Sequence, residues 1–509
     1  MRLVSSIRNA YSSLLLQIAA ILLGLLSQAV FIRYLGIQYA GVSGVLSNII
    51  SMLSLAELGV GTAMVYSLYE PLAKGNVEKV KSLMGLYRRV YQIIGIVIGC
   101  SGLLILPFTS YFFKNLTVDV NLNLVFLFYL LNTVISYFYT YKRSLLYADQ
   151  KDYLNKFISF GSLAIMNILQ ISTLMVFKNY YIYLAIRIIV MIGENVFVSH
   201  IVNKKYPFLR CKTVQPIEKE EKGRIVSNIK ALFFHKIGGF VVLGTGNLIV
   251  SSLISVTAAG IFGTYQLLTK NLMGIGSVII DSVTASFGNL LALEREKSYT
   301  VFNKLFYFNF ALATITGCCL LTCLHPFMQL FAGPNNVFAF SVELIIVVEY
   351  YIHSMRVSIG VGKNAAGLYR PDRFVPLWES FVNLAASLLL VRLLGVAGVI
   401  LGMILSTLLS VFISVPYLTF RYVYQKPLIL YYKMYLYYFI IALICGITSF
   451  GICYISAIPN YFLEFVKNGV LSVMTSGLLI FFITHRREEF KYFIVIFWKL
   501  LNRKLSPQV

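Results

Sequence analysis

The chain is a succession of long apolar runs separated by short polar gaps. Most runs reach about 20 residues, the length an α-helix needs to cross the hydrocarbon core of a membrane. The first run follows a basic segment and is too long for a signal peptide, so we expect it to remain as the first helix. The pattern predicts about fourteen transmembrane helices, at residues 11–33, 37–68, 86–113, 121–141, 157–177, 180–202, 227–250, 253–291, 300–325, 337–360, 374–391, 396–423, 434–456 and 464–484.

The composition agrees with a membrane protein. Of 509 residues, 58% are hydrophobic and only 12% are charged, whereas a soluble domain carries about 25% charged residues. The longest polar gap, 203–226, is too short to bury a core of its own. The sequence therefore predicts an all-α polytopic membrane protein without a soluble domain.

The distribution of cations predicts the topology. Of 43 Lys and Arg residues, 35 lie in one set of alternate gaps or at the termini, and 5 lie in the other set. Cytoplasmic loops of membrane proteins carry this excess, so we expect both termini in the cytoplasm, which requires an even number of helices. The same distribution explains the net charge of +23, and we expect no nucleic-acid partner.

A weak internal repeat divides the chain. Ala40-Gly41-Val42-Ser43-Gly44 resembles Ala259-Gly260-Ile261-Phe262-Gly263 at an offset of 219 residues. Ordinary packing of small residues between helices is the alternative explanation. The offset equals a six-helix unit, which favours two duplicated halves followed by two further helices. We therefore expect a six-helix lobe at 1–203, a cytoplasmic linker at 204–226, a second six-helix lobe at 227–424, and two accessory helices with a tail at 425–509.

No catalytic or metal-binding motif is present in the sequence. It contains no GxxxxGK[ST] phosphate loop and no HExxH zinc motif, and its five histidines do not cluster. None of the seven cysteines has a metal-ligand spacing with histidine. We therefore expect no enzyme activity, no metal and no cofactor.

Ionisable residues at membrane depth remain as candidates for function. Such residues are costly in lipid and normally face an interior cavity. Arg187 and Glu194 are seven residues apart, and Lys270 and Asp281 are eleven apart, so each pair shares a helix face within about 20°. Glu349 begins a stripe that continues through His353 and Arg356. Internal ion pairs that stabilise the bundle are the alternative role for all of them.

These residues fall into two groups. The three cations at depth are candidates to bind an anionic substrate: Arg187, Lys236 and Lys270. The carboxylates are candidates to couple transport to a proton or sodium gradient: Glu57, Glu194, Asp281 and Glu349.

Lys270 is the most informative of the cations. It lies near mid-depth with polar neighbours at Gln266, Thr269 and Asn271. Asp281 is about 16 Å away along a straight helix. We expect an anion of the substrate, or a carboxylate on another helix such as Glu57, to lie beside the ammonium group.

Several stretches together resemble the polysaccharide repeat-unit flippases, which export O-antigen and capsular oligosaccharides. These flippases belong to the multidrug/oligosaccharidyl-lipid/polysaccharide (MOP) exporter superfamily. Each motif has low specificity by itself. The order and spacing of the motifs together carry the resemblance over nearly the whole chain. The stretches are RYLGIQYAGV at 33–42, LAELGVGTA at 55–63, YEPLAK at 69–74, FGNLLA at 287–292, YRPDRF at 369–374 and RLLGVAGV at 392–399.

The resemblance implies two six-helix lobes around a central cavity, with two accessory helices. It implies an undecaprenyl-diphosphate-linked oligosaccharide as substrate, moved from the inner to the outer leaflet of the bacterial cytoplasmic membrane by alternating access. Transporters of this superfamily couple to protons, sodium or membrane potential. Expected partners are membrane lipids and the polymerase and glycosyltransferases of the same pathway, including those that build lipopolysaccharide.

Three other functions stay open at the level of sequence. An ion-coupled drug/cation antiporter of the same superfamily would have an acidic cavity, and the four carboxylates at depth keep it in view. A peptidoglycan-precursor flippase would differ mainly in its glycan. A membrane polysaccharide polymerase is less consistent with the chain, because every outward gap is short.

Overall fold

The computed structural model is all-helical in the part of the chain that it describes, residues 2–57, 59–210, 244–281, 283–368 and 371–495 with a few single residues between 217 and 229. Twelve helices in these residues are long and apolar enough to span a membrane, so the protein is a multi-pass membrane protein. Two further predicted spans do not appear among the twelve. One, 37–68, is an interrupted helix, and most of the other, 227–250, lies outside the described residues.

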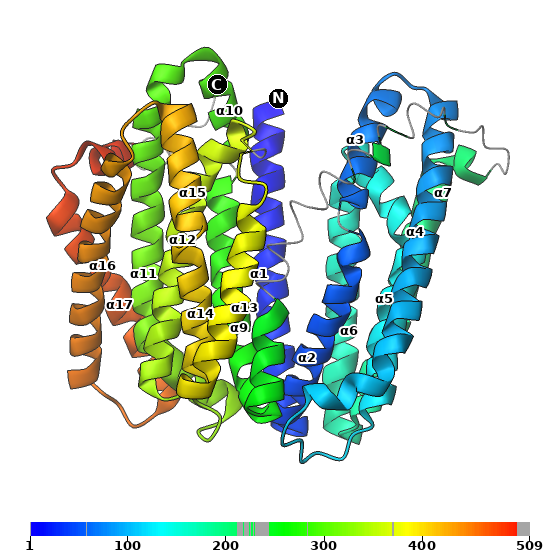
Figure 1. Ribbon diagram of the computed structural model, residues 1–509, viewed down its shortest axis with the longest axis horizontal. Coiled ribbons are helices and arrows are strands. Elements are labelled where there is room, and N and C mark those ends of the chain that lie inside the picture. The colour runs from blue at the N-terminus through cyan, green and yellow to red at the C-terminus, as the bar shows by residue number, and fades with distance from the viewer. Residues whose placement is uncertain are drawn as a thin grey trace, which may run out of the picture. The chain divides into compact units, whose positions relative to one another are not determined.

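The chain forms two compact units, residues 1–264 and 265–509. Figure 1 labels the helices of both. This division falls within one helix, α9, and the domain boundaries expected from the sequence stay a prediction. The first unit contains α1 (Arg2–Leu35), α2 (Ile37–Leu53), η1 (Ser54–Glu57), α3 (Val60–Ala73), α4 (Val77–Ile105), η2 (Leu106–Phe112), α5 (Leu122–Ala148), α6 (Asp152–Phe177), α7 (Tyr180–Lys205), η3 (Pro207–Arg210) and the start of α9 (Val256–Asp281).

In the first unit, α5 packs against α4, α6 and α7, and α1 packs against α6. The expected single helix at 37–68 is corrected by the structure: α2 ends at Leu53, and α3 begins at Val60 after a break. Gly59 lies in the break with a left-handed φ of 92°, which glycine adopts without steric cost. The break therefore has a local cause in the sequence GVG at 59–61.

The start of α9 packs directly onto α2 in the first unit. A Cβ atom on Gly41 would overlap the carbonyl oxygen of Val256, and one on Gly260 would overlap the carbonyl oxygen of Ile37. The 219-residue offset relates Gly41 to Gly260 and Ile37 to Val256, so the two contacts are reciprocal. The two repeat copies thus meet backbone to backbone, and the side chain of Gln38 donates to Thr257 across the same contact at 3.1 Å.

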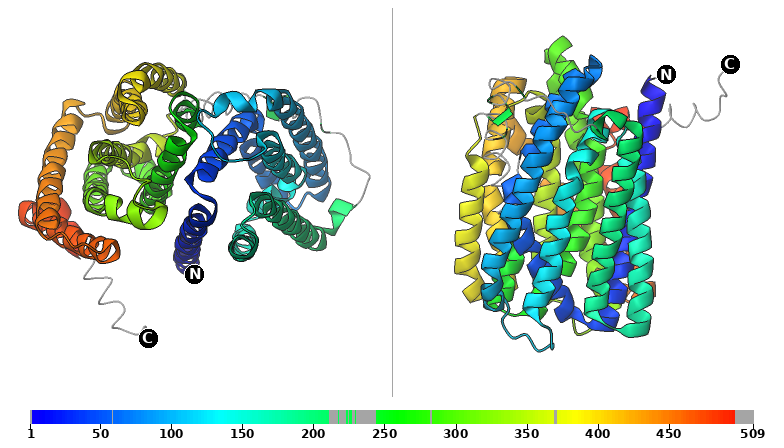
Figure 2. Two further views of the ribbon diagram at one scale, coloured as in Figure 1. Left: turned by 90° about the horizontal axis from the view of Figure 1, so that it is seen from below. Right: turned by 90° about the vertical axis from the view of Figure 1, so that its right-hand side faces the viewer.

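The second unit is built around α11, which packs against α12, α16 and α17, and α13 pairs with α14. The end-on view in Figure 2 shows α16 and α17 together on one side of this unit. Beyond the rest of α9, its elements are α10 (Thr284–Leu293), η4 (Arg295–Lys297), α11 (Ser298–Ala332), α12 (Phe340–Ala365), α13 (Val375–Leu394), α14 (Val396–Leu408), α15 (Val411–Leu418), the π-helix η5 (Thr419–Tyr424), α16 (Ile429–Ile455) and α17 (Tyr461–Thr484).

Aromatic rings fill the core of the second unit along α11. Phe302, Phe306 and Phe310 recur every turn and are fully buried, and Phe310 stacks on Tyr438 of α16 with ring centroids 4.4 Å apart. Pro326 lies inside α11 and cannot donate to the carbonyl of Thr322. The amide of Asn468 on α17 donates to that carbonyl instead, at 2.9 Å.

Candidate functional site

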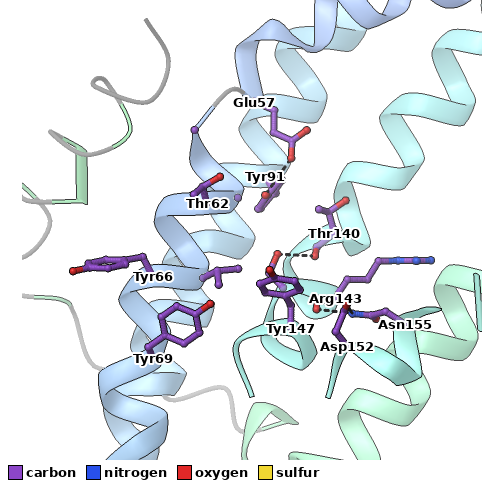
Figure 3. A pocket seen from close by; sticks show the side chains of 14 residues that line it. Glu57, Thr62, Tyr66, Tyr69, Tyr91, Thr140, Arg143, Tyr147, Asp152 and Asn155 are labelled. Atoms are coloured by element: carbon purple, nitrogen blue, oxygen red, sulfur yellow. Dashed lines mark hydrogen bonds between the residues drawn. The ribbon is translucent and has the colours of Figure 1, made fainter. Parts of the chain in front are cut away.

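A polar pocket of about 630 Å³ lies within the first unit, between α3, α4, α5 and the start of α6 (Figure 3). Its size is in the range of about 300–1,000 Å³ that is typical of small-molecule sites. Polar and aromatic side chains dominate its wall, which is formed by Glu57, Gly59, Gly61, Thr62, Val65, Tyr66, Tyr69, Tyr91, Thr140, Arg143, Ser144, Tyr147, Asp152 and Asn155.

Three tyrosines present large surfaces at this pocket. Tyr66 and Tyr69 come from α3 and are 71% and 44% exposed, and Tyr147 of α5 is 52% exposed. Their spacing of three residues places Tyr66 and Tyr69 on one face of α3, as Figure 3 shows. A tyrosine offers an apolar ring face and a hydroxyl at once, so this wall can contact amphipathic ligands such as sugars.

The break between α2 and α3 borders the pocket. Glu57 ends η1 inside the break, and its partners in the described part of the chain are tyrosine hydroxyls. Tyr91 donates to its Oε1 atom at 3.3 Å, and Tyr137 also forms a hydrogen bond with it. Irregular backbone at membrane depth is tolerated where it lines a polar cavity. The break thus places Glu57 in the pocket wall, and the residues that the structure describes include no cationic partner for it.

The charge on Arg143 is compensated within the unit. Its Nη2 atom donates to Glu194 of α7 at 2.7 Å and to Asn195 at 3.1 Å. Its Nη1 atom donates to Ser159 of α6 at 3.1 Å, and Ser159 donates to Glu194 at 2.8 Å. In Figure 3 the guanidinium group extends away from Tyr66 and Tyr69. The pocket wall therefore combines neutral polar side chains with the carboxylates of Glu57 and Asp152. The guanidinium group of Arg143 instead joins α5 to α6 and α7.

The turn between α5 and α6 is tied to the end of α7. The carboxylate of Asp149 accepts hydrogen bonds from Lys151 and from the hydroxyl of Tyr206. Burial alone would raise the pKa of Asp149, but these two hydrogen bonds and the charge of Lys151 outweigh it and lower that pKa. Burial and the hydrogen bond to Asp149 raise the pKa of Tyr206. The hydrogen bond from the neutral hydroxyl of Tyr206 to the ionised Asp149 thus joins the α5–α6 turn to the end of α7.

The structure separates two sequence-predicted residues that share a face of α7. Glu194 pairs with Arg143, and the guanidinium carbon of Arg187 lies over the ring of Tyr129 at 5.4 Å. Lys236 lies outside the described residues. Arg187 and Lys270 belong to different compact units, so their joint role in a substrate cavity stays a prediction.

Lys270 is exposed on α9 and donates to Gln266 one turn earlier at 3.4 Å. Within the second unit, the carboxylate whose charge acts on it is Glu349 of α12. Glu57 belongs to the first unit, so its expected place beside Lys270 stays a prediction. Glu349 itself contacts His353 at 3.0 Å, while Arg356 pairs with Glu379 of α13 at 3.1 Å. Two members of the α12 stripe, Glu349 and His353, therefore contact each other, and the third, Arg356, pairs with a carboxylate of α13.

Asp281 is exposed at the end of α9, and the described residues include no ion-pair partner for it. Of the carboxylates proposed for ion coupling, it is thus the one left without a compensating cation or a tyrosine hydroxyl in that part of the chain. In contrast, Glu194 pairs with Arg143, and Glu349 contacts His353.

Sequence reasoning missed three charged groups. Arg143 counted as a loop cation, although α5 continues through it to Ala148. Glu379 was not selected although it is only 4% exposed. Glu343 lies in the first turn of α12, where a carboxylate is usually a surface feature, and yet it is 3% exposed. Only Glu379 carried a usable signal, a lone acidic residue within a predicted span.

No family model and no curated protein sequence matches this chain. Solved structures do match in fold. The lipid II flippase MurJ in an inward closed conformation is 12% identical, with a TM-score of 0.70 over 92% of this chain and 98% of that one. An inward-facing multidrug resistance MATE transporter of the MOP superfamily is 11% identical, with a TM-score of 0.62 over 80% and 98%.

A third similar structure is the MATE multidrug transporter DinF-BH. It is 16% identical, with a TM-score of 0.58 over 82% of this chain and 96% of that one. At these identities the likeness concerns the fold. The chain is thus an all-α, multi-pass membrane protein that has the fold of the MurJ flippase and the MATE transporters.

Proposed function

We propose that this protein flips undecaprenyl-diphosphate-linked oligosaccharide repeat units from the inner to the outer leaflet of the bacterial cytoplasmic membrane by alternating access. The observation that carries the proposal is the pocket of tyrosines, hydroxyls and amides inside a membrane-spanning unit. A glycan cannot cross hydrocarbon without polar partners. The resemblance of the sequence to repeat-unit flippases and the MurJ-like fold support the same substrate class.

The pocket suits the glycan better than the diphosphate. Tyr66, Tyr69 and Tyr147 offer ring faces, and Thr62 and Asn155 offer hydrogen-bonding groups. Carboxylates accept hydrogen bonds from sugar hydroxyls, but they repel phosphate. In this proposal the diphosphate is bound by cations elsewhere, with Lys270, Arg187 and Lys236 as candidates.

The test uses purified protein in proteoliposomes with a lipid-linked oligosaccharide. Flipping is measured as the rate at which the glycan becomes protected from an external glycosidase. We expect the double variant Tyr66→Ala/Tyr69→Ala to flip about tenfold more slowly, because each aromatic contact contributes about 0.5–1.5 kcal/mol.

The matched control is Tyr111→Ala in η2, which is 77% exposed and lies outside the pocket. It should flip at the wild-type rate. A double variant that is well folded and as active as the control would contradict a role for the pocket in binding the glycan.

Lys270 provides a separate test of the diphosphate site. Lysine is a good point-charge partner for phosphate. We expect Lys270→Ala to insert normally and to lose flipping, and Lys270→Arg to restore part of the rate. If the role of Lys270 is instead to compensate Glu349, Lys270→Ala should fold poorly and Lys270→Ala/Glu349→Gln should recover. A well-folded Lys270→Ala protein with full activity would contradict both roles.

One observation favours the drug/cation antiporter as a second candidate. Glu57 and Asp152 both line the pocket, and within the described ranges Glu57 has tyrosine hydroxyls rather than a cation as partners. A cationic drug could approach these carboxylates and the tyrosine rings. Gradient-driven uptake of an organic cation, abolished by Glu57→Gln and without flipping of any lipid-linked glycan, would establish the antiporter. Flipping of a peptidoglycan precursor alone would establish the third candidate.

A further inference from the structure

A buried carboxylate in the second unit lies between three helices, far along the chain from the pocket residues. Glu343 of α12 is 3% exposed. The hydroxyl of Tyr265 on α9 donates to its Oε1 atom at 2.5 Å, and Nδ1 of His325 on α11 lies 3.1 Å from its Oε2 atom. Each oxygen of the carboxylate therefore has one partner, and the two partners belong to two other helices.

The histidine gives this cluster access to protons. The side chain of His325 is 47% exposed, whereas that of Glu343 is 4% exposed, so the ring is the part of the pair that can exchange a proton with its surroundings. His325 lies seven residues before the end of α11, about 10 Å along the helix, next to the 333–339 connection that the cation distribution predicts to be external. Glu464 of α17 is the other charge that acts on the imidazole.

The tyrosine links the cluster to the division between the two units. Tyr265 is fully buried and is the first residue of the second unit, immediately after Thr264. Its hydroxyl also accepts from the backbone N–H of Phe338 at 3.3 Å, and its ring stacks on Phe338 with centroids 5.2 Å apart. Through Tyr265, Glu343 thus joins the part of α9 that belongs to the second unit to α11 and α12.

We propose that His325 and Glu343 form a proton-binding site, open to the face predicted to be external, whose protonated state fastens α9 to α11 and α12. With one proton shared, the pair is neutral and can stay buried. Without it, Glu343 is a buried anion whose partners, the hydroxyl of Tyr265 and the neutral ring of His325, supply no positive charge, which is costly. We expect the carboxylate then to turn towards water and to release Tyr265.

This inference deepens the proposed transport function, on which it rests, by naming the proton as the coupling ion. It differs from the carboxylates suggested from the sequence. Glu194 pairs with Arg143, and Glu349 contacts a histidine of its own helix, whereas the two partners of Glu343 come from two other helices. Histidine is the side chain that titrates between about pH 5 and 8, so external pH would control the contact in the physiological range.

The experiment measures hydrogen exchange of the α9 segment 261–269 in the purified full-length protein. After correction for the intrinsic pH dependence of amide exchange, we expect about tenfold stronger protection at about pH 6 than at about pH 8. His325→Gln and Glu343→Gln should remove this difference. His200→Gln, at an exposed histidine of α7, is the matched control and should keep it.

Tyr265→Phe separates the proton site from simple loss of folding, because it removes one hydroxyl and keeps the ring packed on Phe338. We expect weak protection of 261–269 at both pH values in this variant, with the rest of α9 unchanged. Equal protection at the two pH values in the wild type would overturn the proposal, as would a pH dependence that persists in Glu343→Gln.

A transport arm distinguishes the proton site from the proposed function. If lipid-linked oligosaccharide is flipped, its rate should depend on external pH in the wild type and not in Glu343→Gln. A flipping rate that ignores external pH in the wild type would overturn the coupling role. Absence of flipping together with pH-dependent exchange would instead contradict the proposed function and leave the proton site supported.

Discussion

Arg143 and Glu194 form the best-connected ion pair among the described residues of the first unit. They lie 51 residues apart in the sequence and join α5 to α7, with Ser159 of α6 bonded to both. Their side chains are 26% and 17% exposed, so solvent screens the pair only in part. Removing one partner of such a pair leaves the other as a poorly solvated charge, which costs more than the net contribution of the pair.

We therefore expect Arg143→Ala to lower the free energy of unfolding by about 1–3 kcal/mol, and Arg143→Ala/Glu194→Ala to recover part of the loss. Thermal unfolding in detergent measures both. The matched control is Lys74→Ala, because the Lys74–Glu70 pair is 71% exposed on both sides, so solvent screens it and its loss should change stability little. Equal losses for Arg143→Ala and Lys74→Ala would contradict the structural role of the pair.

At the scale of elements, the crossing of α2 with the start of α9 depends on glycine. Gly41 faces the backbone of Val256, and Gly260 faces the backbone of Ile37. Small residues allow helices in membranes to approach this closely. The contact is reciprocal at an offset of 219 residues, which is what two copies related by a two-fold axis produce. The glycines of the two AGxxG segments therefore form the crossing between α2 and α9.

We expect Gly41→Ala and Gly260→Ala each to lower stability by about 1–3 kcal/mol, because the added methyl group overlaps a carbonyl oxygen that cannot move without shifting its helix. Gly161→Ala in α6 is the control, since nothing lies within 4 Å of a Cβ atom at that position. It should be neutral or stabilising, as alanine favours helix over glycine. Thermal unfolding of the three variants tests the crossing, and a stable Gly41→Ala/Gly260→Ala double variant would speak against it.

At the scale of the whole molecule, the cation distribution predicts the orientation in the membrane. Of 43 Lys and Arg residues, 35 lie on one predicted side and 5 on the other, and this excess predicts that both termini lie in the cytoplasm. Reporter fusions after residues 80, 215 and 365 should read cytoplasmic, and fusions near 117, 335 and 460 should read external. An external signal at 215 would reverse the predicted orientation of the second half, and one at 365 would remove the external access proposed for His325.

Much of the architecture could be predicted from the sequence because the membrane restricts which segments of a chain can cross it. A segment that spans hydrocarbon must be helical and apolar over about 20 residues, so runs such as 121–141 and 180–202 coincide with α5 and α7 within a few residues at most ends. The AGxxG segments were also visible as a repeat. These features depend on the order of residues along the chain and not on which helices become neighbours.

The partners of the charged residues were decided only by the tertiary structure. Helical periodicity placed Arg187 and Glu194 on one face, but Glu194 pairs with Arg143 of another helix, and Glu343 joins His325 and Tyr265 from two others. The break at Gly59 places Glu57 in the wall of a pocket that no sequence motif predicts. The length of an apolar run indicates that a segment spans the membrane. The pairings of charged residues depend on how each helix is rotated and on which helices lie beside it, and the hydrophobic pattern of the sequence does not specify either.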